Sequence, residues 1–330
     1  MKRVVALLAT VIVTSALAAC GGGGAEPGAR DRATLVLDFQ PNAVHAGIYA
    51  AVREGYYQDA GVDLQVREPS ASTDAPKLLI AGRAQFAILD IHDLGLARER
   101  HLKLVGVMPI VQRPLAAVIA ADRAEVRRPS DLAGATVGVT GLPSDDAVLD
   151  SVLQAGGLDP AGVRRVTIGF QAVSSLAAGK VDAATAFWNA EGVTLQRQGI
   201  PIREFRVDDY GAPRYPELVL ATGGRLLSQQ PSLVRRVVGA TARGYALAVS
   251  DPSRALDDLL AADPALDRDE QAAELRALEG ANAFEPVARF NRAALAAWAR
   301  WDVRHGILER RPDVRSAFPI QASSSVSAAR

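Results

Sequence analysis

Cysteine is nearly absent from this sequence, because Cys20 is the only one among 330 residues. A single thiol excludes an intrachain disulfide, a cysteine metal cluster and a pair of catalytic cysteines. Net charge is absent as well, since 37 basic residues balance 37 acidic ones. A balanced chain lacks the basic surface typical of nucleic-acid-binding proteins, so we expect no nucleic-acid partner.

Catalytic motifs are also missing. The sequence contains no G-x-S-x-G nucleophile elbow, no H-E-x-x-H zinc motif and no Walker A pattern. The four histidines at 45, 92, 101 and 305 have no metal-ligand spacing, and the adjacent Asp145 and Asp146 are typical of solvated charges at a helix start. We therefore expect no metal, no cofactor and no catalytic residues, and an exported enzyme remains the alternative from a different class.

A long apolar run occurs at the start of the chain. Lys2 and Arg3 precede mostly apolar residues from 4 to 18, and small residues lead up to Cys20. These are the three parts of a secretory signal, and the run is short for a permanent membrane helix. The sequence therefore predicts a signal over 1–20, a flexible tether over 21–33 and an exported mature chain.

The signal ends in Leu17-Ala18-Ala19-Cys20, which resembles the lipobox of bacterial lipoproteins. In such proteins the cysteine becomes the acylated first residue of the mature chain. We expect Cys20 to anchor the protein to the outer face of the bacterial cytoplasmic membrane or within the periplasm. The alternative is an ordinary signal that happens to contain a cysteine.

Short β-branched runs alternate with helical stretches from residue 34 onward. Hydrophobic periodicity predicts strands at 34–39, 62–67, 84–89, 104–108 and 115–120, with helices at 46–59, 75–81 and 94–100. The rhythm restarts near 120 and predicts strands at 136–140, 166–168, 183–187, 202–207 and 217–222, with helices at 144–155, 173–178 and 190–198, before a long helical region. This order predicts an α/β fold with two units, each a largely parallel sheet that binds ligands at the carboxyl ends of its strands.

Several segments together carry a family resemblance. They are LDFQPN at 37–42, HAGIYAA at 45–51, GYY at 55–57, GVDL at 61–64, QRPL at 112–115, PSDLAG at 129–134, GKVDA at 179–183, WNAE at 188–191 and DYGAPRYPEL at 209–218. This pattern resembles the NMT1/THI5-like periplasmic binding proteins, and within them the binding components of ABC importers for thiamine pyrimidine precursors.

The resemblance implies a two-lobed, type II periplasmic-binding fold whose lobes close over a small heteroaromatic ligand. The first lobe would be 34–120 plus 218–330, the second would be 121–217, and the hinge crossings would lie near 120 and 217. It also implies an ABC permease and its ATPase as partners, and we expect a monomer. The ligand would be an aminopyrimidine, with a riboflavin-like compound or an alkanesulfonate as alternatives in the same fold.

Pyrimidine synthases of related fold are a further alternative, and they use a histidine near the position of His92. They also have a cysteine-rich iron motif where this chain has residues 209–217 without a cysteine, and a glycine-rich loop with a lysine where residues 141–145 contain none. We therefore do not expect synthase activity.

Aromatic and acidic residues near strand ends are candidates for ligand contacts. The aromatic ones are Phe39, Tyr49, Trp188 and Tyr210, and Phe39 stands where the family more usually has tryptophan. The resemblance implies that Glu191 faces the pyrimidine, although a first-turn acid is also favoured by the helix dipole. Trp188 is either a stacking face or a core aromatic.

Polar residues in the same loops complete the candidate set. Asn189 either donates to the ligand or caps the next helix. Asn42 and His45 match the family motif, and His45 either contacts ligand or ties its loop to the following helix, while Asp38 would pin that loop by local hydrogen bonds. Asp90 and His92 fall at a strand end and would line the cleft.

Overall fold

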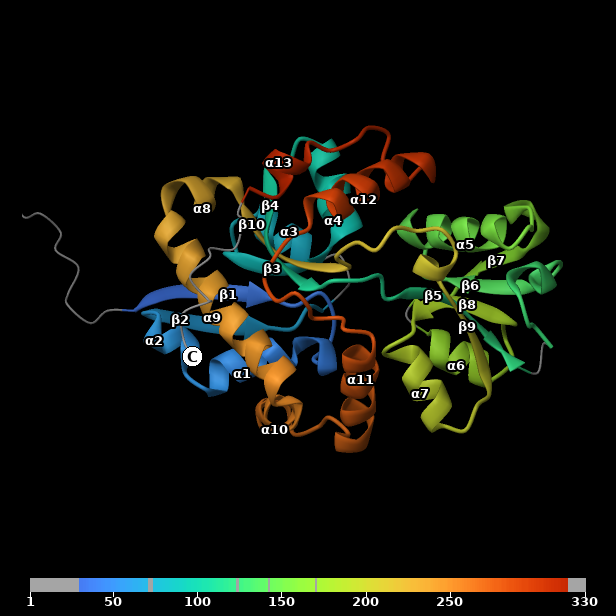
Figure 1. The fold of residues 1–330 in the computed structure, drawn as a ribbon, viewed down its shortest axis with the longest axis horizontal. Coiled ribbons are helices and arrows are strands. Elements are labelled where there is room, and N and C mark those ends of the chain that lie inside the picture. Colours follow the sequence, from blue (N-terminus) through green and yellow to red (C-terminus); the bar gives the residue numbers. More distant parts are fainter. Residues whose placement is uncertain (1–29, 71–73, 123–124, 142, 170, 320–330) are drawn as a thin grey trace, which may run out of the picture.

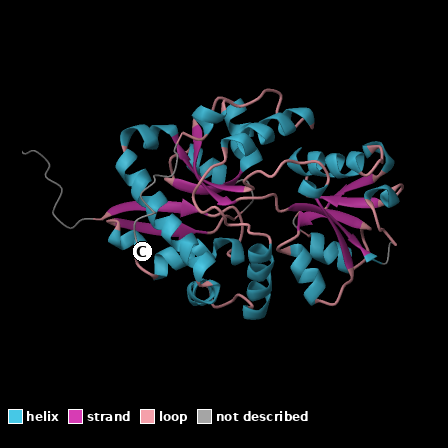
Figure 2. Cartoon of the chain, viewed as in Figure 1, coloured by secondary structure: helices cyan, strands magenta, loops and turns pink. Residues whose placement is uncertain are grey.

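The computed structural model describes residues 30–319 except 71–73, 123–124, 142 and 170. The predicted signal, Cys20 and residues 21–29 of the predicted tether lie outside the described residues. The described chain forms two lobes, each built on a five-stranded sheet with helices on its faces (Figures 1 and 2). The predicted α/β class with two units is confirmed.

The first lobe contains a sheet with the strand order β2-β1-β3-β10-β4. Its strands are β1 (Asp31–Val36), β2 (Val62–Arg67), β3 (Phe86–Asp90), β4 (Leu104–Val111) and β10 (Leu218–Gly223). Between them lie η1 (Ala43–His45), α1 (Ala46–Arg53), α2 (Tyr56–Asp59), α3 (Asp74–Ile80) and α4 (Ile91–Glu99). The C-terminal part adds α8 (Gly224–Gln229), α9 (Pro231–Ser250), α10 (Pro252–Ala262), α11 (Arg268–Gly280), α12 (Arg292–Arg304) and α13 (Val314–Ala317).

The second lobe contains a sheet with the strand order β7-β6-β8-β5-β9. Its strands are β5 (Ala116–Ala121), β6 (Thr136–Val139), β7 (Arg164–Thr167), β8 (Ala183–Phe187) and β9 (Ile202–Arg206). Its helices are η3 (Pro129–Leu132), α5 (Pro143–Ala155), η4 (Pro160–Gly162), α6 (Ala172–Ala177), α7 (Glu191–Arg197) and η5 (Val207–Asp209).

Each sheet is mixed, although a largely parallel one is predicted from the sequence. In the first sheet β10 runs antiparallel to both β3 and β4, and in the second β5 runs antiparallel to both β8 and β9. The remaining pairs are parallel. In each sheet the antiparallel strand is the first one after the chain crosses from the other lobe, β5 in the second lobe and β10 in the first. The crossing therefore sets the direction of this strand.

Two predicted boundaries differ from the structure. The strand at 116–121 pairs in the second sheet, so the first crossing lies at residues 112–115 and not near 120, while the second lies at 210–217. The predicted tether reaches residue 33, but β1 already begins at Asp31, where its register against β2 starts. Strand pairing, which hydrophobic pattern does not reveal, sets both limits.

Helix α1 is closely packed on one face of the first lobe. This helix packs against α9 and α10. A side chain at Gly244 would place Cβ only 1.9 Å from the carbonyl oxygen of Gly47, and one at Gly47 would lie 2.5 Å from the Tyr245 ring. Glycine at both positions is therefore required for the backbones of α1 and α9 to approach this closely.

Helix α11 belongs to the C-terminal part of the chain but lies beside α7 of the second lobe (Figure 1). Thr194 donates to Glu270 over 2.5 Å, and Arg197 lies 3.4 Å from Asp267. The lobes therefore meet at α11 as well as at the two crossings. In the part of the chain that the structure describes, no helix has both the length and the apolar character needed to cross a bilayer.

Candidate functional site

A cavity of about 400 Å³ lies between the two lobes. Its first wall comes from the loop after β1, from α3, and from the end of β3 with the start of α4. Its second wall comes from the segments that follow β6 and β8. Both walls are made by the carboxyl ends of parallel strands, where α/β folds bind their ligands. The volume is within the range usual for small-molecule sites.

The first wall contains Phe39, Asn42 and Asp90 of the predicted site residues. Phe39 is 37% exposed, an unusual degree for a large apolar side chain. The Asn42 side chain accepts from the backbone N–H of Val44 over 2.9 Å and so fixes the loop that leads into η1. Asp90 caps α4 by accepting from the backbone N–H of His92 over 2.6 Å.

Asp93, one turn into α4, also lines this wall, and burial together with the charge of Asp90 raises its pKa to about 7. Asp38 adds to this shift, whereas the cationic side chains of His92 and Arg100 oppose it. Lys77 on α3 lines the same cavity. The first wall therefore has a carboxyl group that titrates near neutral pH.

The second wall contains Asp145, which is expected from the sequence to be a solvated charge. Its Oδ2 accepts from the backbone N–H of Thr140 over 2.8 Å and from the hydroxyl of Thr185 over 3.0 Å. Burial raises its pKa despite these bonds, and the charge of Asp90 on the opposite wall adds to the shift. Asp145, in the first turn of α5, therefore belongs to the cavity wall and is not a solvated charge.

Glu191 and Phe187 lie next to each other in the second wall. The backbone N–H of Phe187 donates to Oε2 of Glu191 over 3.0 Å, which fixes the carboxyl group between the end of β8 and the start of α7. Burial raises the pKa of Glu191, and the charge of Asp145 adds to this. In its protonated form such a carboxyl group both donates and accepts hydrogen bonds, whereas a carboxylate only accepts.

Asn189 also lines the cavity, and of its two predicted roles the structure contradicts the helix cap. The residue is 1% exposed, and neither its Oδ1 nor its Nδ2 has a hydrogen-bond partner. The N-cap of α7 is Ala190, so Asn189 is not the helix cap. A buried amide without partners costs roughly 1–3 kcal/mol unless something satisfies it.

Five other predicted residues are not among those that line the cavity. His45 is buried, with Nε2 2.9 Å from Asp38 Oδ1, and Nδ1 accepts from the backbone N–H of Asn42 over 3.2 Å. These bonds hold the loop before α1, which is the structural one of the two roles predicted for His45. They are also the local hydrogen bonds expected of Asp38. Tyr49 is buried one turn further along α1, where burial and the charge of Glu68 raise its pKa to about 12.

Trp188 and Tyr210 have internal neighbours instead of a place in the cavity wall. The indole N–H of Trp188 donates to the carbonyl of Pro114 over 3.0 Å, and the guanidinium of Arg206 lies 4.1 Å from its ring centroid. Tyr210 packs edge-on against Phe205, with ring centroids 5.7 Å apart. Adjacent residues in an extended segment point in opposite directions, so Phe187 faces the cavity and Trp188 the interior.

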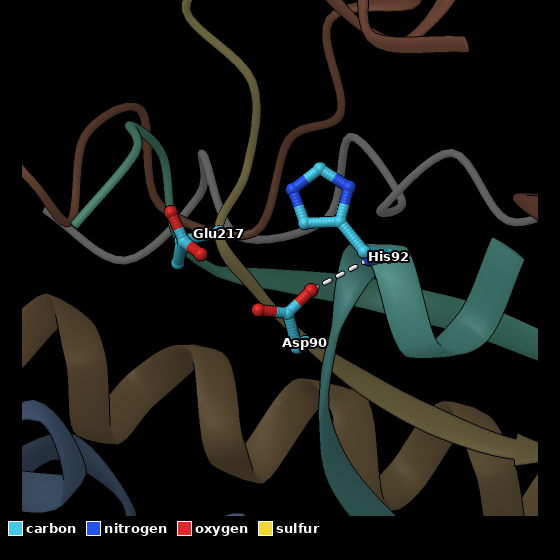
Figure 3. Close-up of side chains that lie close together, drawn as sticks. All are labelled: Asp90, His92 and Glu217. Carbon is cyan, nitrogen blue, oxygen red and sulfur yellow. Dashed lines mark hydrogen bonds between the residues drawn. The ribbon is translucent and has the colours of Figure 1, made fainter. Parts of the chain in front are cut away.

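His92 lies behind the first wall with Asp90 and Glu217 (Figure 3), close enough that one ligand atom of each lies within 4.8 Å of the others. Both ring nitrogens already have partners: Nδ1 is 2.9 Å from Asp302 Oδ2, and Nε2 is 3.2 Å from the Tyr215 hydroxyl. Burial alone would lower the His92 pKa, but the carboxylates of Asp302 and Asp90 raise it to about 10. Because both ring nitrogens are already engaged by these partners, the cluster fits a buried ion pair better than a metal site.

Glu217 joins this buried cluster to the hinge. Its Oε2 accepts from the backbone N–H of Leu115 over 2.7 Å, so the second crossing holds the first. Burial and the nearby Asp90 raise its pKa well above the usual range. Leu115 in turn accepts from the backbone N–H of Trp188 over 3.0 Å. The two crossings and the second lobe are therefore connected through one buried carboxyl group.

The geometry defines a class of protein: a two-lobed α/β fold with a ligand-sized cavity between lobes that are joined by two crossings. Periplasmic binding proteins have this fold. The alkanesulfonate-binding protein SsuA of Xanthomonas axonopodis pv. citri, solved bound to MOPS, superposes with a TM-score of 0.69 at 18% identity, covering 89% of this chain and 99% of that one.

The family model described as NMT1/THI5 like matches residues 42–255, and the chain belongs to this family. The formylaminopyrimidine-binding protein of Halalkalibacterium halodurans is 31% identical over 260 residues, which cover 78% of each protein. The 4-amino-5-hydroxymethyl-2-methylpyrimidine phosphate synthase of Legionella pneumophila is 24% identical over 247 residues, covering 72% of this chain and 75% of the synthase. The family resemblance expected from the sequence is thus confirmed.

Proposed function

We propose that this chain is the solute-binding component of an ABC importer and captures an aminopyrimidine precursor of thiamine. The observation that carries the proposal is the cavity between the lobes, with Phe39 on one wall and Phe187 and Glu191 on the other. A flat ring with acceptor nitrogens and an exocyclic amine needs apolar faces and in-plane polar partners. The two phenylalanines supply the faces, and Glu191 supplies a carboxyl group at the edge.

Glu191 suits the edge of an aminopyrimidine because its pKa is raised by burial. In its protonated form it donates to a ring nitrogen while its second oxygen accepts from the exocyclic amine. Asn189 offers an amide without a partner in the same wall. The ligand contacts that we propose are therefore Phe39, Asn42, Asp90, Asn189 and Glu191, with Phe187 added.

The formylaminopyrimidine-binding relative supports this ligand class, because the similarity covers most of both chains. Ligand would contact both walls and stabilise the closed arrangement in proportion to its preference for that arrangement. The closed lobes would then present a surface to a permease and its ATPase. We propose that the binding protein acts as a monomer.

We also propose that the chain is not an enzyme, although the family includes synthases. His92, which the resemblance places near the histidine used by the synthases, forms a buried pair with Asp302 behind the cavity wall. Segment 209–217 has no cysteine to hold iron. Incubation with each pyrimidine, followed by mass spectrometry, checks this directly, because any converted product would contradict it.

Export and lipid anchoring at Cys20 complete the proposal. The sequence of residues 1–20 supports them, and the solved neighbour SsuA is a binding protein of the same fold. Mass spectrometry of the membrane fraction should find diacylglycerol on Cys20. Cys20→Ser should move the protein to the soluble exported fraction, and a wild-type protein without lipid would contradict the anchor.

Titration calorimetry and thermal melting with aminopyrimidines, thiamine, riboflavin and alkanesulfonates test the ligand. A pyrimidine at one hundred times its dissociation constant should add about 2.7 kcal/mol to the free energy of unfolding. Glu191→Ala should weaken pyrimidine binding about tenfold, because both the donor and the acceptor of the carboxyl group are lost. Glu204→Ala, outside the cavity in the same lobe, is the matched control. Binding of riboflavin or a sulfonate without any pyrimidine would contradict the proposal.

A further inference from the structure

The cavity between the lobes is strongly acidic although the whole chain is neutral. Five carboxylic acids line it, against two cationic residues, Lys77 and Arg100; the acids are Asp38, Asp90, Asp93, Asp145 and Glu191. The complete sequence has 37 residues of each sign. The excess of acidic over basic side chains is therefore a property of this cavity and not of the protein as a whole.

The acids lie on both walls and affect one another across the cavity. Besides burial, the charge of Asp90 on the first wall raises the pKa of Asp145 on the second, and Asp145 in turn raises that of Glu191. Like charges that face each other in a partly dry space repel, and the repulsion grows as the lobes approach. A cation between the walls would turn this repulsion into attraction.

Three of the five acids are held by hydrogen bonds from the backbone. Backbone N–H groups fix Asp90, Asp145 and Glu191, through the bonds from His92, Thr140 and Phe187 described above. Asp90 and Asp145 also occupy the starts of α4 and α5, the places where an α/β fold usually receives an anion. A sulfonate or phosphate entering there would meet carboxylates.

A second observation indicates that a ligand belongs in this acidic cavity. The Asn189 amide, 1% exposed, lines it without a hydrogen-bond partner for either polar atom. Charged residues alone do not explain an unsatisfied neutral amide in the same wall. A ligand with a polar edge as well as a positive charge satisfies both features.

We propose that the site selects a cationic aminopyrimidine, one that carries a protonated amine, over neutral pyrimidines and over anions. This inference rests on the proposed pyrimidine function and adds the charge of the ligand. Binding of the cation places its ammonium group among Asp90, Asp93, Asp145 and Glu191. Asp93, whose pKa is raised to about 7, then ionises, so binding releases protons to solvent.

The test compares 4-amino-2-methylpyrimidines that differ at position 5, using titration calorimetry of the intact exported protein at pH 7. The aminomethyl compound is a cation, the hydroxymethyl compound is neutral and of similar size, the formylaminomethyl compound is neutral, and the hydroxymethyl phosphate is an anion. We expect the aminomethyl compound to bind about 10- to 100-fold more tightly than the hydroxymethyl one, with no binding of the phosphate. Repetition in buffers of different ionisation enthalpy should show proton release.

Asp145→Asn refines the test, because the amide oxygen still accepts from Thr140 and only the charge is lost. The substitution should weaken binding of the aminomethyl compound about tenfold and leave binding of the hydroxymethyl compound unchanged. Asp182→Asn, which removes a carboxylate outside the cavity of the same lobe, should change neither.

Three outcomes are distinguishable with wild-type protein alone. Preference for the cation supports the inference. Equal or tighter binding of the hydroxymethyl or formylaminomethyl compound, or binding of the phosphate, overturns the inference and leaves the pyrimidine function intact. If no pyrimidine binds, the proposed function itself fails and the inference fails with it.

Discussion

Asp90 and Asp145 occupy corresponding places on the two walls of the cavity, but the residues behind them differ. Asp90 ends β3 and accepts the backbone N–H of His92 in α4, whereas Asp145 lies in the first turn of α5 and accepts the backbone N–H of Thr140, directly after β6. Behind Asp90 lies a buried group of charges, His92, Asp302 and Glu217. Asp145 instead has a threonine hydroxyl as its side-chain partner. The first wall is thus continuous with the hinge, whereas the second is supported by neutral donors within its own lobe.

The difference teaches where binding and stability are coupled. A charge change on the first wall reaches Glu217, which holds Leu115 in the crossing. A charge change at Asp145 acts on Glu191 in the same wall and on Asp90 across the cavity. Mutations in the first lobe should therefore affect both folding and ligand binding, while those in the second wall should act mainly on the ligand.

The largest effect is expected when the buried ion pair is broken. Asp302→Ala leaves protonated His92 without its close partner, and we expect a loss of about 3–5 kcal/mol in the free energy of unfolding. Urea denaturation measures it. Asp182→Ala in the second lobe removes a carboxylate that accepts only one described backbone N–H, and should cost about 1 kcal/mol. Equal losses would remove the distinction between the lobes.

The next effect is the pH dependence of the unliganded protein. Burial raises the pKa of Asp93 to about 7 and of Glu274, on α11, to about 8, so folding favours their protonated forms. Their contribution to stability is present at low pH and is lost as pH rises through 7 and 8. His92, with its pKa raised to about 10, contributes stability below about pH 6.5 that is lost toward pH 10.

All three groups therefore act in the same direction, and the free energy of unfolding should fall by several kcal/mol between pH 5 and pH 9. Thermal and urea denaturation across this range measures the fall. Asp93→Asn should make the free energy of unfolding depend less on pH near neutral pH. Stability that rises with pH over this window would contradict the assignment.

The smallest of these effects concerns Phe39 and Phe187, one ring on each wall. The two rings should contribute about equally to ligand binding. Phe39→Ala and Phe187→Ala should each weaken pyrimidine binding by about 1–3 kcal/mol, the value of a ring stacked on a flat base. Trp188→Phe is the matched control, because it removes the bond to Pro114 without changing the cavity wall. If Trp188→Phe weakens binding as much as Phe187→Ala does, then Trp188 and not Phe187 faces the ligand at the end of β8.

Much of the fold could be predicted because hydrophobic periodicity and turn residues are local signals in the sequence. The strands at 62–67 and 183–187 have the predicted limits. The predicted helix at 46–59 is divided into α1 and α2 at Gly55, which has a φ of 73°. β1 lies three residues before its predicted place, since Leu37 and Phe39 continue the apolar alternation beyond the end of the strand. Pairing partners and strand direction depend on contacts between distant residues, which a local pattern does not contain.

The candidate site was predictable at the level of loops but not of side chains. The family motifs identify the segments after β1 and β8, the predicted strand end identifies Asp90, and Phe39, Asn42, Asp90, Asn189 and Glu191 line the cavity. Phe187 was missed because Trp188, one residue later, is the more conspicuous aromatic, and strand alternation decides which of the two faces the ligand. Asp145 was missed because burial at a helix start depends on the opposite lobe.

The contact between α11 and α7 has a consequence for ligand affinity. A motion that separates the lobes there must break the Thr194–Glu270 hydrogen bond and separate Arg197 from Asp267. These residues lie outside the cavity wall, yet they change the fraction of molecules whose lobes stand close enough to bind, and the measured dissociation constant varies inversely with that fraction. Affinity in this protein can therefore be tuned through a C-terminal helix while the ligand's own contacts remain unchanged.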